Sequence, residues 1–214
     1  MKAIINTKLI LEDSIIFDGA ITFEDGVIVQ MGKAAEVEIP EGAEIIDAGG
    51  KYTAPGLIDI HNHAGGGHWY YDEPIEAAQF NLKHGTTTNL ACLYFNMNGQ
   101  QLVEQIATVK AAMATPEGES IVGFYMECPY MNPKFGANRE NNPWKGPINK
   151  DEYMPIIEKG GSDVRVWVTA PEREGIKQFV IDAKSVNPNV RFSVGHSEAT
   201  PAQVEELIPY GLCI

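Results

Sequence analysis

The pattern of hydrophobic and polar residues changes near residue 50. Before this point, short apolar and β-branched runs are separated by turn residues. The expected strands are residues 2–5, 14–17, 20–23, 27–31 and 43–47. Glu24-Asp25-Gly26 separates two of these runs and is a hairpin signal. We therefore predict a small β-sandwich module over residues 1–50.

After residue 50 the apolar runs are continuous and lie farther apart. The expected strands are residues 56–60, 86–93, 121–126, 164–169 and 190–194. Runs without alternation are typical of strands that are buried on both faces of a parallel sheet. These runs therefore predict an α/β fold for residues 51–214.

Helical patterns lie between the expected strands. One apolar face repeats over Leu102, Ile106, Val109 and Met113, and another over Ile176, Phe179, Val180 and Ala183. Thr200-Pro201-Ala202-Gln203 is a capping box with proline at the first helical position. Strands and helices thus alternate in about five βα units. No glycine-rich phosphate turn follows the first strand, so an incomplete TIM-like (β/α) barrel is favoured over an open doubly wound sheet.

Residues able to bind a metal follow three of the five expected strands. His61 and His63 follow the first strand, Glu127 the third and His196 the fifth. The carboxyl ends of barrel strands meet at one face, so we expect these four side chains to converge there. Imidazoles and a carboxylate are zinc ligands. The alternatives are a chance His-x-His pair, a carboxylate in a helix cap or salt bridge, and a hydrogen-bonded histidine without a metal.

Composition and charge exclude several functions. The chain has 214 residues, of which 44% are hydrophobic and 21% charged, as in an ordinary globular protein. The net charge of -13 disfavours nucleic acid and anionic membranes as partners. Three scattered cysteines imply no disulfide framework. We expect no signal peptide or membrane span, and hence a cytoplasmic location.

Four motifs carry a resemblance to a known family. They are the segments 54–63 (APGLIDIHNH), 85–88 (GTTT), 127–129 (ECP) and 195–200 (GHSEAT). On these residues the chain resembles the amidohydrolase superfamily, and within it the N-acetylglucosamine-6-phosphate deacetylase family. The last motif is the most specific of the four.

The resemblance implies a metal-dependent hydrolase that removes the N-acetyl group from an amino-sugar phosphate, such as N-acetylglucosamine 6-phosphate. Glu127 and His196 would be metal ligands, with His61 and His63 at a second metal position. The cofactor would be one or two divalent ions, zinc or alternatively iron or another ion. Ala137 and Asn138 occupy the positions of a substrate-binding pair, in a polar loop after Glu127. The full-length form would be a homodimer.

The chain departs from the family pattern in three respects. Asn138 stands where the family often has histidine, and Cys128 replaces a glycine. A further metal histidine, the phosphate-binding residues and the catalytic aspartate are expected beyond Ile214, so we expect little activity from this chain alone. The alternatives are an amidohydrolase for another amino sugar or a cyclic amide, and a non-catalytic truncated protein that binds metal or a partner.

Overall fold

The computed structural model describes residues 1–213. The chain divides into two compact units, Met1–Gly56 and Leu57–Ile214. In the part that the structure describes, no helix combines the length and apolar character needed to cross a membrane.

The first unit is a five-stranded sheet. Its strands are β1 (Lys2–Ile10), β2 (Ile15–Glu24), β3 (Val27–Lys33), β4 (Glu44–Asp47) and β5 (Tyr52–Thr53), with a 3-10 turn η1 (Ala34–Glu36) after β3. β1 is central and pairs antiparallel with β2 and parallel with β4 and β5. The runs expected at 14–17 and 20–23 form one strand, β2, instead of two. A single sheet does not establish the predicted β-sandwich.

The second unit contains the parallel sheet that the continuous apolar runs predict. Its strands are β6 (Leu57–Asn62), β9 (Thr86–Tyr94), β10 (Ile121–Glu127), β11 (Val164–Thr169) and β12 (Arg191–Val194), in the order β12-β11-β10-β9-β6. A short hairpin of β7 (Ala64–Gly65) and β8 (His68–Trp69) follows β6. Sequential neighbours in a parallel sheet form one arc of a (β/α) barrel, so the predicted α/β class is confirmed.

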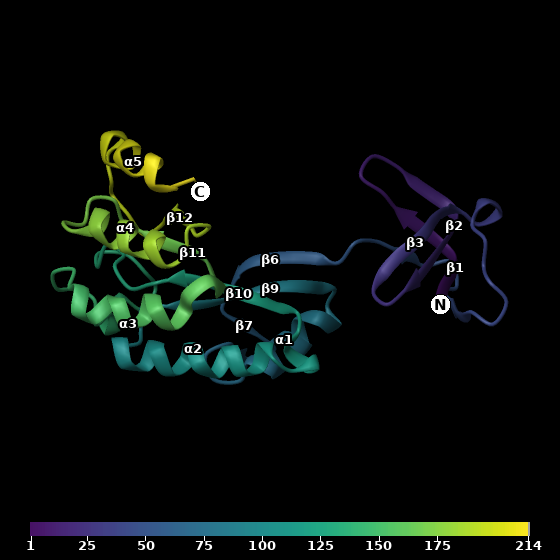
Figure 1. Ribbon diagram of the computed structural model, residues 1–214, viewed down its shortest axis with the longest axis horizontal. Helices are drawn as coiled ribbons and strands as arrows, with labels where there is room; N and C mark the ends of the chain where they lie inside the picture. Colours follow the sequence, from purple (N-terminus) through teal and green to yellow (C-terminus); the bar gives the residue numbers. More distant parts are fainter. Residues whose placement is uncertain (214) are drawn as a thin grey trace. The chain divides into compact units, whose positions relative to one another are not determined.

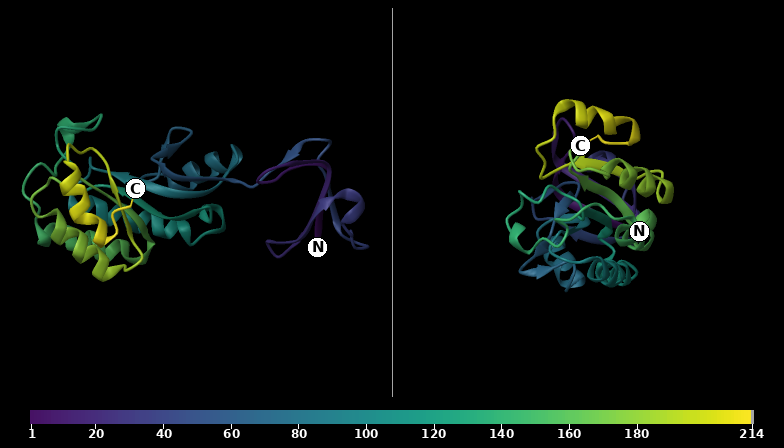
Figure 2. Two further views of the ribbon diagram at one scale, coloured as in Figure 1. Left: turned by 90° about the horizontal axis from the view of Figure 1, so that it is seen from above. Right: turned by 90° about the vertical axis from the view of Figure 1, so that its left-hand side faces the viewer.

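The helices follow one another around this sheet. They are α1 (Pro74–Lys83), α2 (Gly99–Met113), α3 (Lys150–Gly160), α4 (Ile176–Val186) and α5 (Pro201–Leu207), with 3-10 turns η2 (Pro116–Gly118), η3 (Arg139–Asn141), η4 (Gly161–Asp163) and η5 (Ile208–Tyr210). Neighbouring helices pack in chain order, α1 on α2, α2 on α3 and α3 on α4 (Figure 1). The right-hand view of Figure 2 shows the colours of this unit passing from blue through green to yellow along the sheet.

The core of the second unit lies between the sheet and these helices. Leu102, Ile106 and Val109 of α2 are fully buried, as their helical spacing predicts. Phe179 of α4 packs edge-on against Trp167 of β11, with ring centroids 5.3 Å apart. Burial of each such side chain contributes about 1.5–3 kcal/mol to stability.

The two edges of the parallel sheet differ. After α5 the chain returns to β12, where the Phe192 amide donates to the Gly211 carbonyl at 3.1 Å and the Cys213 amide donates to the Phe192 carbonyl at 3.0 Å. The outer edge of β12 is therefore partly paired within the chain. At the other edge, Leu57 and Ile58 of β6 are 63% and 71% exposed.

Candidate metal centre

The carboxyl ends of the parallel strands bring the four predicted metal residues to one place. His61 lies in β6 and His63 directly after it, whereas Glu127 is the last residue of β10 and His196 follows β12. His61 and His63 are two residues apart in extended chain, so their side chains reach the same side. Segments far apart in the sequence thus meet because all these strands point the same way.

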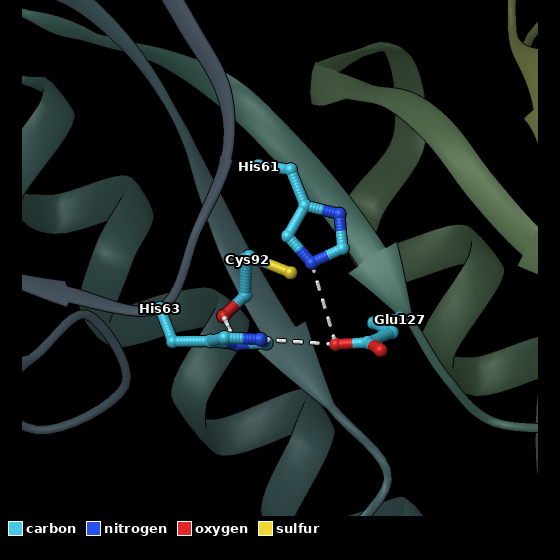
Figure 3. A group of neighbouring side chains, drawn as sticks. All are labelled: His61, His63, Cys92 and Glu127. Carbon is cyan, nitrogen blue, oxygen red and sulfur yellow. Dashed lines mark hydrogen bonds and ion pairs between the residues drawn. The ribbon is translucent and has the colours of Figure 1, made fainter. Parts of the chain in front are cut away.

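Three imidazoles converge on the carboxylate of Glu127. The Nε2 atoms of His63 and His61 lie 3.0 Å and 3.5 Å from Oε2 (Figure 3). The Nε2 atom of His196 lies 2.5 Å from the other oxygen, Oε1. The two oxygens therefore face different imidazoles. The Glu127 side chain is only 9% exposed, whereas the three histidines are 31–40% exposed.

The second ring nitrogen of His63 identifies the tautomer. Nδ1 lies 3.2 Å from the Cys92 carbonyl oxygen. A carbonyl only accepts, so Nδ1 carries the proton and donates. In the neutral ring Nε2 then presents a lone pair to a Glu127 oxygen, which also has only lone pairs. Such a contact requires a proton or another cation between the two atoms. A hydrogen bond from Nδ1 to a backbone carbonyl, as His63 makes to Cys92, is also the usual way in which a metal-binding histidine is oriented.

The pKa of Glu127 reflects the same arrangement. Burial alone would raise the pKa of this carboxyl, but the imidazoles of His61, His63 and His196 around it outweigh burial and hold the pKa well below its ordinary value. Glu127 is therefore an ionised carboxylate inside the site. A buried negative charge of this kind needs a cation nearby.

Cys92 is a further potential ligand that the sequence patterns did not reveal. The ligand atoms of His61, His63, Cys92 and Glu127 all lie within 4.8 Å of one another. Cys92 is fully buried, and burial raises the pKa of its thiol in the protein without a metal. The position of Cys92 near the end of β9 could have identified it, because β9 lies between the two strands that carry His61 and Glu127.

The backbone around His196 adopts an unusual conformation. His196 has a φ of 48°, in the left-handed region that non-glycine residues rarely adopt. The His196 carbonyl accepts a 3.0 Å hydrogen bond from the Asn132 amide. A Cβ on Gly195 would lie 2.6 Å from Val168, so a side chain there would displace this turn. The tertiary structure thus holds the His196 loop in a strained conformation.

A cavity of about 500 Å³ opens directly onto these residues. Its lining residues are His63, Trp69, Tyr94, Phe95, Glu127, Ala137, Asn138 and His196. The predicted substrate-binding residues, Ala137 and Asn138, therefore share a cavity with predicted metal ligands. Trp69 stacks on Tyr94 with ring centroids 5.7 Å apart.

The patterns missed Tyr94 and Phe95. Tyr94 ends β9, two residues after Cys92. Because residues two apart in a strand face the same side, its place at the strand end could have identified it as a residue of the site. Of the aromatic residues after the first strand, Trp69 lines the cavity, whereas Tyr70 is fully buried and its hydroxyl accepts a 3.0 Å hydrogen bond from Asn81.

Comparisons with known proteins agree with the family resemblance. The chain is 24% identical over 214 residues to N-acetylglucosamine-6-phosphate deacetylase of Bacillus subtilis, covering 95% of this chain and 52% of that protein. It is 33% identical over 105 residues to dihydroorotase of Acetivibrio thermocellus, which covers 49% of this chain and 23% of that protein. No protein-family model matches. The chain thus spans about half the length of the deacetylase.

Solved structures show the same fold. The N-acetyl-D-glucosamine-6-phosphate deacetylase of Mycobacterium smegmatis matches with a TM-score of 0.78 and 22% identity, over 99% of this chain and 59% of that one. A variant of that enzyme, solved in complex with N-acetyl-D-glucosamine-6-phosphate, also matches with a TM-score of 0.78. The chain is therefore similar to N-acetylglucosamine-6-phosphate deacetylases along almost its whole length, as its motifs predict.

Proposed function

We propose that the chain contains the metal centre and part of the substrate cavity of a hydrolase that removes the N-acetyl group from an amino-sugar phosphate. Residues 1–50 would be the small β module, and residues 51–214 the N-terminal portion of the (β/α) barrel. The observation that carries this proposal is the convergence of three imidazoles on the two oxygens of Glu127 at the wall of a cavity.

The donor set fits a divalent ion. Ligand atoms bound to one zinc ion lie about 2.0–2.3 Å from it, and so about 3–4 Å from one another. The separations of His63 and His61 from Glu127 Oε2, 3.0 Å and 3.5 Å, fall in this range. The lone pairs that face each other between His63 and Glu127 also call for a cation.

The two oxygens of Glu127 support two metal positions. Oε2 would share one ion with His61 and His63, and Oε1 would share the other with His196. Imidazole and carboxylate donors suit zinc, and they also suit iron. When bound, such an ion polarises a carbonyl and activates water for hydrolysis.

The remaining cavity residues would bind the sugar. About 500 Å³ is within the range of small-molecule sites. The exposed face of Trp69 offers an apolar surface for a pyranose ring, and the Asn138 amide offers polar contacts beside it. The complex of the Mycobacterium smegmatis variant with N-acetyl-D-glucosamine-6-phosphate supports this substrate class.

The described residues supply the metal centre and the substrate cavity in our proposal, and the chain spans about half the length of the Bacillus subtilis deacetylase. The full-length protein would be a homodimer. Metal binding and ligand binding are therefore the direct readouts for this chain.

Metal titration of the purified chain tests the metal centre. We expect two divalent ions to bind to the unaltered chain. The substitutions His196→Ala and His63→Ala should each remove one ion, and Glu127→Gln should remove both. His84→Ala is the matched control, because His84 caps α1 and contacts the Phe80 carbonyl instead of Glu127. Full binding by the Glu127→Gln variant would refute the proposal.

Ligand binding to the metal-loaded chain tests the substrate class. We expect N-acetylglucosamine 6-phosphate to bind more tightly than dihydroorotate, a cyclic amide. N-acetylgalactosamine 6-phosphate is included because Asn138 is a departure from the family pattern. The match to a dihydroorotase over 105 residues makes the cyclic amide a pertinent comparison. Preferential binding of dihydroorotate would reassign the site to cyclic amides.

A further inference from the structure

We propose that the Cys92 sulfur is a ligand of the metal position that His61 and His63 share, and that this position therefore selects a thiophilic divalent ion over Mg²⁺ or Mn²⁺. This inference rests on the proposed function, since it concerns the same metal centre. The inference goes beyond the proposed function because it assigns a sulfur ligand and a class of metal.

The sheet places Cys92 between the other ligands. β9 lies between β6 and β10, the strands that carry His61 and Glu127. Cys92 is paired with Tyr125 of β10, and the preceding residue, Ala91, is paired with Asn62 of β6. The register therefore aligns Cys92 with both ligand-bearing strand ends.

The side chain of Cys92 points into the group. Its sulfur lies within 4.8 Å of a ligand atom from each of His61, His63 and Glu127, and Figure 3 shows it beside the His61 ring. The Cys92 carbonyl also accepts the hydrogen bond that orients His63. One residue would thus supply a metal ligand and position another, both through contacts present in the structure.

The chain contains an internal comparison. Cys128 directly follows Glu127 and is also fully buried, but it does not belong to the group of converging ligand atoms. Burial near the site is therefore not sufficient to bring a sulfur among these ligands. The position of Cys92 on β9 does so.

A sulfur ligand changes which ions the site prefers. Thiolate and imidazole together favour zinc and similar ions, whereas Mg²⁺ and Mn²⁺ prefer oxygen ligands. The thiol releases its proton to solvent as the sulfur–metal bond forms. The position of His61 and His63 would then have nitrogen, oxygen and sulfur ligands, and the position of His196 only nitrogen and oxygen. The two positions would differ in their affinity for soft ions.

Cobalt binding by the full chain tests the proposal. Co²⁺ replaces zinc and reports its ligands: any bound Co²⁺ gives visible d–d bands, and a thiolate ligand adds a charge-transfer band in the near ultraviolet. We expect both signals in the unaltered chain. Cys92→Ser should lose the charge-transfer band, keep the d–d bands and bind Zn²⁺ at least about tenfold more weakly. Its affinity for Mn²⁺ should stay the same.

Cys128→Ser and Cys213→Ser are the matched controls, and both should keep the charge-transfer band. They also keep the test valid if Cys92→Ser fails to fold, because the unaltered chain and these two variants alone locate the sulfur. Absence of d–d bands would refute the metal centre itself. Two results would overturn the role of Cys92 and leave the metal centre intact. One is d–d bands without a charge-transfer band in the unaltered chain, and the other is loss of the charge-transfer band in Cys128→Ser.

Discussion

The hydroxyl of Ser197 donates a 2.6 Å hydrogen bond to Oε2 of Glu172, and this contact fixes the residue that follows His196. The other oxygen of Glu172 accepts hydrogen bonds of 2.8 Å from the Glu198 amide and from the Asn132 side chain. Burial alone would raise the pKa of Glu172, but these hydrogen bonds outweigh it and lower the pKa. An ionised carboxylate therefore holds the strained loop of His196 through hydrogen bonds to the two residues that follow it.

We expect Glu172→Ala to loosen this loop. The Glu198 amide loses its acceptor, so its hydrogen exchange should become faster, and metal affinity should fall about 10–100-fold, as for other residues that orient a ligand. Exchange measured by NMR and metal titration check these effects. Glu174→Ala, an exposed neighbour, is the control. Unchanged exchange at Glu198 would show that the loop holds His196 without Glu172.

Ile106 tests the packing of α2. Its side chain is fully buried, so Ile106→Ala leaves a cavity and should lower the free energy of unfolding by about 2–5 kcal/mol, and Ile106→Val by about 1 kcal/mol. Urea denaturation gives both values. Thr108→Ala on the exposed side of the same helix should change the free energy by less than about 0.5 kcal/mol. Equal effects of the alanine variants at 106 and 108 would contradict this packing.

Asn98 tests the start of α2. Its Oδ1 accepts a 3.0 Å hydrogen bond from the Gln101 amide, and the Gln101 side chain accepts a 2.9 Å bond from the Asn98 amide. Asn98→Ala removes one half of this capping box and should cost about 1 kcal/mol of stability. Asn98→Ser keeps an acceptor and should restore most of the loss. Thermal or urea unfolding distinguishes the variants, and an equal loss in both would exclude capping as the cause.

Asp182 should make the protein sensitive to acid. Burial would raise its pKa, but hydrogen bonds from Tyr153, Lys150 and Gln178 outweigh burial and hold the pKa below 3.8. The native state therefore binds this proton less readily than the unfolded state. The resulting stabilisation is complete above the unfolded pKa and is lost as the pH falls through the native pKa.

We expect Asp182→Asn to be less stable than the unaltered chain near neutral pH, and to lose less stability on acidification below about pH 4. Urea denaturation over a series of pH values checks both effects. Glu158→Gln removes an exposed carboxylate from α3 and serves as the control. If the free energy of unfolding fell equally with pH in the Asp182→Asn variant and in the unaltered chain, the role of Asp182 would be contradicted.

Several elements were predictable because their causes are local. The five continuous apolar runs match β6 and β9 to β12, and the capping box at Thr200 and Gln203 precedes α5. The hydrophobic pattern did not predict helix α3. Its buried residues Tyr153, Ile156 and Ile157 have helical spacing, but Pro155 lies between them, and proline inside a helix is a strong contrary signal.

By itself, the sequence determined the order of strands and helices, and it placed His61, His63, Glu127 and His196 at strand ends, because side-chain periodicity and chain direction are local properties. Only the tertiary structure decided that His196 faces Oε1 while His61 and His63 face Oε2, and that Cys92 lies among them. Those relationships depend on register and on the positive φ of His196, which contacts between distant segments fix. No periodicity along a single strand encodes them.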